Sequence, residues 1–190
     1  MEKGQDVLES GKLYHIYSRA IGKELLFLNE ENYKFFLKKY DQYCSSIFET
    51  IAYCLIPNHF HLLVRIKDDI ANEVVVRDFS NFLNSYSKSF NNTNGRRGGL
   101  FQRKFKRKLI DREPYLSRII LYIHLNPVKH EIVDDFSEWQ FSSYNSYCTN
   151  KPSKIFRELG LEWFGGIEEF QKIHQEIEKD YLPEDLRLEI

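Results

Sequence analysis

Two histidines separated by one residue are the sharpest chemical feature of this 190-residue chain. They are His59 and His61, with Phe60 between them. Side chains two residues apart point to the same side of a β-strand, so both imidazoles would share one face while Phe60 points to the other. Two neighbouring imidazoles are suited to hold one divalent metal ion. The pattern leaves open an alternative, a pair of histidines on a solvated strand face.

A tyrosine and an asparagine one helical turn apart supply a second set of functional groups. Tyr122 and Asn126 lie on an expected helix over 113–126, whose apolar stripe includes Leu116 and Ile120. At about 100° per residue, both fall on one side of the helix and away from that stripe. The amide oxygen of Asn126 could complete a coordination sphere begun by two histidines, and such a set suits a hard divalent ion that also binds a phosphate oxygen. A surface tyrosine on an amphipathic helix is the alternative.

One segment of thirteen residues holds seven basic side chains and no acidic one, although the net charge of the chain is −1. Phosphates attract cations and unpaired bases stack on aromatic rings, so this segment, with two phenylalanines among its charges, indicates a contact with nucleic acid. A solvated charged face is the alternative. On one strand, alternate cations would form two rows on opposite faces, and either row could face DNA. The expected DNA-contacting residues are Arg96, Arg97, Arg103, Lys104, Lys106, Arg107 and Lys108.

Hydrophobic periodicity predicts the elements that carry these residues. Strands are expected over 13–19, 48–56, 59–66 and 100–110, and helices over 29–46, 71–91 and 113–126. The resulting order, β-α-β-β-α-β followed by a helix, is typical of an α+β fold, a ferredoxin-like antiparallel sheet with helices on one face. The other face would be free to bind a partner. His15 and Arg19, on the first expected strand, could border the site or serve the structure alone.

Composition limits the remaining possibilities. With 42% hydrophobic residues the chain can bury a core, and no apolar run approaches the ~20 residues that a membrane span requires. Three cysteines without CxxC spacing favour the reducing cytosol, so we expect a cytoplasmic protein with no membrane partner. Residues 151–190 carry six basic and ten acidic side chains. We expect them to form a small acidic helical C-terminal extension to a domain over 1–150.

Four segments together resemble the REP-associated tyrosine transposases, a branch of the single-tyrosine HUH transposases. HUH denotes two histidines that flank a hydrophobic residue. The segments are YCLIPNHFHLLV (53–64), GGLFQRKFKRKLI (98–110), YLSRIILYIHLNPVKHEIV (115–133) and WQFSSYNSY (139–147). The opening at 14–37 also fits the N-terminal pattern of this family. The resemblance covers about residues 13–147 and, more loosely, the tail.

This resemblance implies a site, a reaction and a partner. His59, His61 and Asn126 would bind Mg²⁺ or Mn²⁺, and Tyr122 would attack a phosphate of single-stranded or hairpin DNA to form a 5′-phosphotyrosine. Because that link conserves the energy of the broken phosphodiester, no nucleotide cofactor is expected. The DNA partner could be a palindromic repeat. The protein could act as a monomer or a homodimer.

Two other functions stay open at this point. A nucleic-acid-binding module on a ferredoxin-like sheet would keep the basic segment and cleave nothing. A metal-dependent phosphoesterase that uses water would cleave without a covalent adduct, and it would stay active in a Tyr122→Phe variant. The joint presence of His59, His61, Tyr122 and Asn126 favours the transposase.

Overall fold

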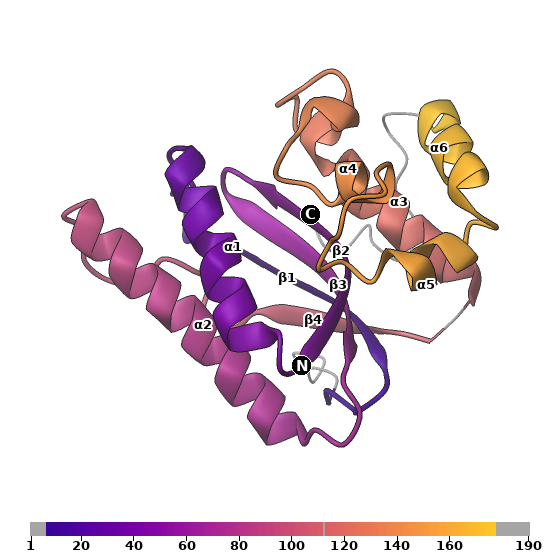
Figure 1. Cartoon of the computed structure of the whole chain (residues 1–190). Coiled ribbons are helices and arrows are strands. Elements are labelled where there is room, and N and C mark those ends of the chain that lie inside the picture. The colour runs from indigo at the N-terminus through magenta and orange to yellow at the C-terminus, as the bar shows by residue number, and fades with distance from the viewer. Residues whose placement is uncertain (1–6, 112, 178–190) are drawn as a thin grey trace, which may run out of the picture.

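The structure, a computed structural model, describes residues 7–111 and 113–177 and contains one four-stranded antiparallel sheet (Figure 1). The strand order is β2-β3-β1-β4, which is the ferredoxin-like arrangement expected from the sequence. The elements are β1 (Leu13–Arg19), α1 (Glu30–Cys44), β2 (Phe48–Ile56), β3 (His59–Ile66), α2 (Asn72–Thr93), β4 (Lys106–Ile110), α3 (Glu113–Lys129), a 3₁₀ turn η1 (Phe136–Glu138), α4 (Tyr144–Tyr147), α5 (Arg157–Glu162) and α6 (Ile167–Glu176).

Helices α1 and α2 lie together on one face of the sheet (Figure 1). Alternate strand residues such as Ile16 and Phe60 point to this side and are fully buried. They pack in one core with Phe36 of α1 and with Phe79 and Phe82 of α2. The two-residue period of the strands and the amphipathic spacing of the helices therefore meet in a single aromatic-rich layer.

The opposite face is not left free as expected, because α3 covers part of it. Ile119 and Ile123 of α3 pack with Ile51 and Ala52 of β2 in a second core. The described part of α3 is buried almost all round, so it needs apolar cover on two sides. The sheet supplies one side, and the C-terminal elements α4 to α6 supply the other (Figure 1).

The strand expected over 100–110 is shorter than the alternation indicates. Phe101 forms an isolated bridge with Ala20, and Lys106 pairs with Tyr17. Four residues, 102–105, thus lie opposite two residues of β1, and the two extra residues break the ladder. Arg103 and Lys104 lie in this bulge, which we call the 102–105 bulge, and not on β4 itself.

Helix α3 runs through Pro127 to Lys129, whereas we expected it to end at Asn126. A proline lacks one backbone N–H, and near the end of a helix that absence costs only one hydrogen bond. The final turn is closed beyond the proline, where the His130 N–H donates to the Asn126 carbonyl at 3.0 Å. The face that carries Tyr122 and Asn126 is therefore one turn longer than the sequence indicates.

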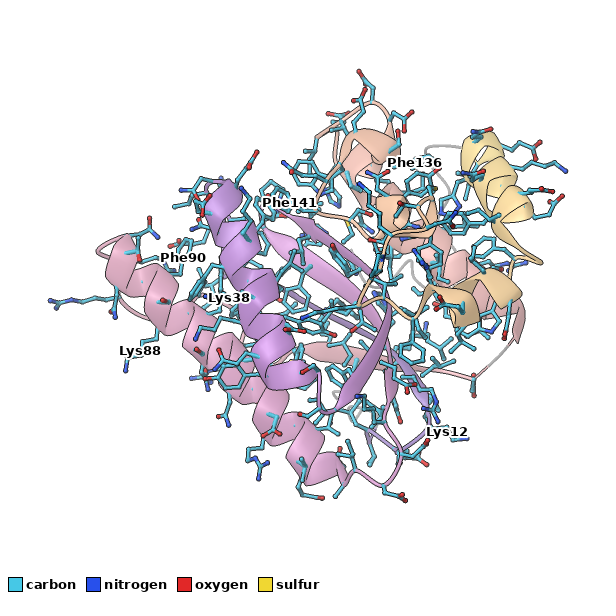
Figure 2. The ribbon with its side chains drawn as sticks, viewed as in Figure 1. Lys12, Lys38, Lys88, Phe90, Phe136 and Phe141 are labelled. Carbon is cyan, nitrogen blue, oxygen red and sulfur yellow. The ribbon has the colours of Figure 1, made fainter. Side chains whose placement is uncertain are left out.

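The outer edge of β2 is covered by the chain that follows η1. The Leu55 N–H donates to the Phe141 carbonyl at 2.9 Å, and the Ser143 N–H donates to the Tyr53 carbonyl at 2.9 Å. Phe141 lies beside this edge in Figure 2. Further along, the Phe156 N–H donates to the Thr50 carbonyl at 2.8 Å. In the described ranges, no helix is long and apolar enough to cross a membrane.

Candidate active site

Strand β3 begins with the two histidines, directly after the Pro57–Asn58 turn. Its alternation places His59 and His61 on the α3 side of the sheet, and Phe60 is fully buried on the other. The two imidazole rings lie 5.0 Å apart and nearly perpendicular. The strand thus presents two imidazoles side by side, as the sequence predicts.

His59 has one ring nitrogen fixed as a donor and the other left as an acceptor. Its Nδ1 lies 2.7 Å from the acceptor Oδ1 of Asn58, so Nδ1 carries the proton. Its Nε2 lies 3.4 Å from Oδ1 of Asn126. The Asn126 amide is oriented by its own Nδ2, which donates to the Tyr122 carbonyl at 2.8 Å. Two lone pairs therefore face each other, an arrangement that a cation between them would stabilise.

His61 is almost completely buried, with 2% of its surface exposed. Its Nδ1 lies 2.9 Å from Nε2 of His15, a fully buried residue of β1. Its Nε2 has no hydrogen-bond partner among the described residues. A buried polar atom without a hydrogen-bond partner destabilises the folded protein, so this nitrogen is suited to bind a ligand from outside the chain.

Both histidines are held in the neutral form. Burial, with the nearby His130, lowers the pKa of His59 to about 3. Burial, with His59 and His15 beside it, holds the pKa of His61 well below its usual value. The unprotonated imidazole is the form that binds a metal ion, so the site is ready to do so at neutral pH without losing a proton.

The donor set therefore fits a divalent metal ion. Two neutral imidazole nitrogens and one amide oxygen converge from β3 and α3. No group of three or more His, Cys, Asp or Glu residues suited to a metal occurs in the described ranges, because the third donor here is an amide. Two nitrogens and one neutral oxygen leave positions open for phosphate oxygens or water.

Tyr122 lines the same pocket, which has a volume of about 130 Å³. Its ring meets His61 edge-on at 5.3 Å, and 3% of its surface is exposed. The ammonium of Lys129, two helical turns along the same face, lies 5.2 Å from the centre of the Tyr122 ring. Ser18 also lines the pocket, and its buried hydroxyl has no partner in the described part of the chain. The pocket thus joins two phenols, three imidazoles and several cations.

The expected DNA-contacting residues do not form one surface. In the β1–β4 register Lys106 lies opposite Tyr17 and Lys108 opposite His15, so both face the α3 side with the histidines. Arg107 lies opposite Ile16 and faces the α1–α2 side. On β4 itself the cations alternate as predicted, with Lys106 and Lys108 on the pocket side and Arg107 on the other, and Lys106 lines the pocket.

The other four cations lie outside the strand. Lys104, in the bulge, lines the active-site pocket and also a groove on the α2 side, where Arg103 lies. Arg96 holds its own loop, since it pairs with Glu24 at 2.8 Å and donates to the Gly99 carbonyl at 2.9 Å. Arg97 is exposed in that loop.

Two curated proteins similar to this chain are both REP-associated tyrosine transposases. A REP-associated tyrosine transposase of Haemophilus influenzae is 32% identical over 118 residues, which are 58% of this chain and 67% of the relative. The chain belongs to this family. A second REP-associated tyrosine transposase, from Escherichia coli, is 27% identical over 126 residues, which are 65% of this chain and 67% of the relative. The chain is thus a transposase enzyme.

A solved structure of a REP-associated tyrosine transposase bound to a REP hairpin has the same fold. Its TM-score is 0.61 at 20% identity, with 80% of this chain and 89% of that chain covered. No family model matches the chain. The sheet order and the added helical C-terminal part agree with this neighbour.

Sequence analysis of this transposase missed two residues of the pocket region. Lys129 lies over the Tyr122 ring, and His130 meets the His59 ring edge-on at 4.8 Å. Both follow Pro127, where we expected the helix to end. On a continued helix, Lys129 falls about 20° from Tyr122, so the same wheel would have found it. His15 was placed at the border of the site, but its contact with His61 was not foreseen.

Proposed function

We propose that this transposase is a metal-dependent nickase and strand transferase that cleaves and rejoins single-stranded or hairpin DNA through a 5′-phosphotyrosine at Tyr122. The observation that carries the proposal is the convergence of His59, His61 and Asn126 beside a buried tyrosine. One imidazole nitrogen without a partner, a second that faces the Asn126 amide oxygen, and a phenol beside them suit phosphoryl transfer, and a purely structural site would have no use for them.

His59, His61 and Asn126 would hold Mg²⁺ or Mn²⁺. When bound, that ion would polarise the scissile phosphate and offset the charge that develops on its oxygens. The neutral state of both imidazoles supports this role, because no proton has to leave before the ion binds. The amide of Asn126 adds an oxygen ligand without adding negative charge near the phosphate.

Tyr122 would be the nucleophile. Its phenolic oxygen loses its proton and attacks the phosphorus, the bond from phosphorus to the 3′ oxygen breaks, and the leaving 3′ oxygen gains a proton to become a 3′-OH. A free phenol has a pKa near 10 and is a weak nucleophile at neutral pH. The ammonium of Lys129 beside the ring favours the phenolate. Attack by a 3′-OH on the phosphotyrosine reverses the reaction, so rejoining needs no nucleotide cofactor.

The partner would be hairpin DNA, because a family member of the same fold was solved with a REP hairpin. Palindromic repeats are one source of such hairpins. The cations that would contact the DNA are Arg96, Arg97, Arg103, Lys104, Lys106, Arg107 and Lys108. Tyr122 lies beside His61 of its own chain, so a monomer would contain a complete site, and a homodimer would contain two.

A covalent-trapping experiment tests this function. Protein, labelled hairpin oligonucleotides of varied flank sequence and Mg²⁺ or Mn²⁺ are mixed and run on a denaturing gel. We expect a metal-dependent shifted band that disappears in Tyr122→Phe and His59→Ala and persists in Tyr115→Phe, the matched control on the same helix. Metal-dependent cleavage that survives Tyr122→Phe would instead establish a water-using phosphoesterase. Binding without cleavage of any hairpin would favour a non-catalytic module.

A further inference from the structure

Arg19, the last residue of β1, is a cation without a partner in the wall of the active-site pocket. It lines this pocket together with His59 and Tyr122, and its side chain is only partly exposed. That side chain makes no hydrogen bond, ion pair or ring contact with any residue that the structure describes. The lining of the pocket, within the same described residues, includes no Asp or Glu. The charge of Arg19 is therefore not neutralised by a neighbouring carboxylate.

The other partly exposed arginines in residues 7–111 and 113–177 are all held by neighbours. A carboxylate pairs with two of them, a phenylalanine ring lies under a third, and backbone carbonyls accept hydrogen bonds from the fourth. These four are Arg65, Arg96, Arg107 and Arg157. A guanidinium has five N–H donors and stays charged in proteins, so Arg19 keeps a full set of donors available for an anion.

The strand register places Arg19 beside the proposed metal ligands. Arg19 lies opposite His59 in the β1–β3 ladder, and Tyr17, two residues earlier, lies opposite His61. Directly opposite residues of an antiparallel pair have Cβ atoms about 4.5–5.5 Å apart. The side chains of Arg19 and His59 therefore leave the same face of the sheet as neighbours, and an arginine side chain is long enough to reach a group bound at His59.

The opening of the sheet beside Arg19 makes room for such a group. The β1–β4 pairing ends at Tyr17, and the 102–105 bulge follows where a residue opposite Arg19 would otherwise lie. The Gln102 N–H donates to the Arg19 carbonyl at 2.9 Å, and Gln102 and Lys104 line the pocket. Burial lowers the pKa of His130, and the charges of Lys129 and Arg19 lower it further, so the positive charge of Arg19 acts within the pocket.

A phosphate group is the anion that suits this arrangement. The fork of a guanidinium binds two oxygens of one phosphate, whereas an ammonium is a point charge on a flexible stem. During phosphoryl transfer the negative charge is spread over the non-bridging oxygens of the phosphate. A cation that is already in place beside those oxygens lowers the barrier, because no reorganisation is needed when the charge develops.

We propose that Arg19 is a catalytic residue of this transposase, and that its guanidinium binds a non-bridging oxygen of the scissile phosphate while Tyr122 attacks the phosphorus. The inference rests on the proposed function and adds one group to its site. Arg19 exchanges no proton or electron with the DNA, so the bonds that form and break are those already given for Tyr122.

The rate of adduct formation tests the catalytic role. We expect Arg19→Ala to lower the single-turnover rate on a cleavable hairpin by about 10²- to 10³-fold, as loss of one transition-state donor commonly does. The affinity for the same hairpin should fall by less than about tenfold, since many other cations contact the DNA. Arg19→Lys retains the charge without the fork and should recover only part of the rate.

A hairpin with a methylphosphonate at the cleavage position tests the contact itself. This linkage replaces one non-bridging oxygen by a methyl group and removes the negative charge that Arg19 would offset. Wild-type protein and Arg19→Ala should therefore bind and cleave this hairpin within about threefold of each other. On the normal phosphate the same two proteins should differ by the full loss.

Binding of inorganic phosphate gives a readout that needs no cleavage. Phosphate is titrated into metal-free Tyr122→Phe protein and followed by the width of its ³¹P resonance. Adding Arg19→Ala should weaken binding by at least about tenfold, because the cation without a partner is lost. Arg77→Ala is the matched control, since Arg77 is exposed on α2 and pairs with Asp78, and it should leave phosphate affinity and adduct formation unchanged.

The outcomes separate this inference from the proposed function. Adduct formation by Arg19→Ala at the wild-type rate overturns the catalytic role, and equal phosphate affinity with and without Arg19 overturns the contact. An equal loss on phosphate and methylphosphonate hairpins also overturns it, because Arg19 would then act on the fold. The midpoint of urea unfolding should not change in Arg19→Ala. Phosphate binding that depends on Arg19 in a protein that forms no adduct supports the contact and contradicts the tyrosine chemistry.

Discussion

Two buried histidine clusters lie on opposite sides of α3, and they differ in how their ring nitrogens are satisfied. On the sheet side, Nε2 of His61 has no partner among the described residues, and Nε2 of His59 faces a second acceptor. On the far side, every ring nitrogen of His124 and His174 has a hydrogen-bond partner. Residue type and burial are the same in both clusters, so neither property identifies the site.

The far cluster is a closed chain of hydrogen bonds. His174 donates from Nδ1 to the Phe170 carbonyl at 2.7 Å, so its Nε2 accepts from Nδ1 of His124 at 2.9 Å. Nε2 of His124 then accepts from the Ser143 hydroxyl at 2.7 Å. The centre of the Phe136 ring of η1, labelled in Figure 2, lies 5.6 Å from the centre of the His174 ring. This cluster fastens α6 to α3, whereas the sheet-side cluster keeps donor atoms available for a ligand.

The largest difference between the clusters should appear in activity. His61→Leu removes a proposed metal ligand and should lower adduct formation by at least ~10³-fold, since the lost interaction stabilises charge in the transition state. The free energy of unfolding should fall by about 1–2 kcal/mol, because Nε2 of His15 loses its hydrogen bond with Nδ1 of His61, whereas the lost Nε2 of His61 leaves no partner behind. Adduct assays and urea unfolding measure the two quantities. A variant that keeps its activity would remove His61 from the proposed site.

The converse is expected on the far side. His174→Leu leaves the buried His124 Nδ1–H without its acceptor, removes the side-chain bond to the Phe170 carbonyl, and should cost about 2–3 kcal/mol of unfolding free energy. Adduct formation per folded molecule should stay within about threefold of the wild type, measured at a temperature where both proteins are folded. If His174→Leu lost most of its activity but none of its stability, the far cluster would serve catalysis and not structure.

His15 connects the sheet-side cluster to β1 and should act by positioning. Its Nε2, when it accepts from Nδ1–H of His61, leaves Nε2 of His61 free to bind a metal. His15→Leu should weaken Mn²⁺ binding by about 10- to 100-fold, as loss of such outer contacts commonly does. His15→Gln retains an acceptor and should restore most of the affinity. Calorimetric titration of the apo protein with Mn²⁺ checks both, and equal losses in the two variants would contradict the positioning role.

The far cluster should also give stability a gradual dependence on pH. Burial lowers the pKa of His174 to about 4 and holds that of His124 well below its usual value, the neighbouring His174 adding to the effect there. Well above pH ~6.5 both rings are neutral in the folded and in the unfolded chain. As the pH falls below ~6.5, the histidines of the unfolded chain bind protons before those of the folded chain do. Stability should therefore be greatest above pH ~6.5 and fall toward pH 4, by at most ~1.4 kcal/mol per pH unit for each histidine.

Urea unfolding between pH 7.5 and 5 measures this slope. His174→Leu removes one of the titrating groups and should flatten the slope by about one proton, while the sheet-side histidines continue to contribute. Stability that rises as the pH falls would contradict the neutral state of these rings.

Much of the fold could be predicted from local patterns. Strands β1, β2 and β3 have the expected bounds, because alternation and the Pro57–Asn58 turn define them within the sequence itself. The 102–105 bulge could not be predicted, since it depends on where two distant strands come into register. The last turn of α3 was missed because Pro127 is a helix breaker on average and is tolerated near a helix end.

The site shows the same division. The spacing of His59 and His61 within one strand, and of Tyr122 and Asn126 within one helix, is local and could be predicted as two pairs. The convergence of the two pairs depends on the tertiary fold. So do the contact between His15 and His61, which are 46 positions apart, and the contact between His124 and His174, which are 50 positions apart. Nothing in local periodicity encodes such contacts, so only the folded chain distinguishes the ligand-ready histidines from the structural ones.

The hydrogen bonds along the outer edge of β2 have a consequence for solubility. The Phe141 carbonyl, the Ser143 N–H and the Phe156 N–H occupy backbone groups that an edge strand would otherwise offer to another chain. The strand beneath them, FETIAYCLI, is apolar and rich in β-forming residues, the composition that favours intermolecular stacking when it is exposed. A chain shortened to end before Phe141 would present this strand to its neighbours and should aggregate as β-sheet fibrils, even though it would keep all four strands and both histidines in its sequence.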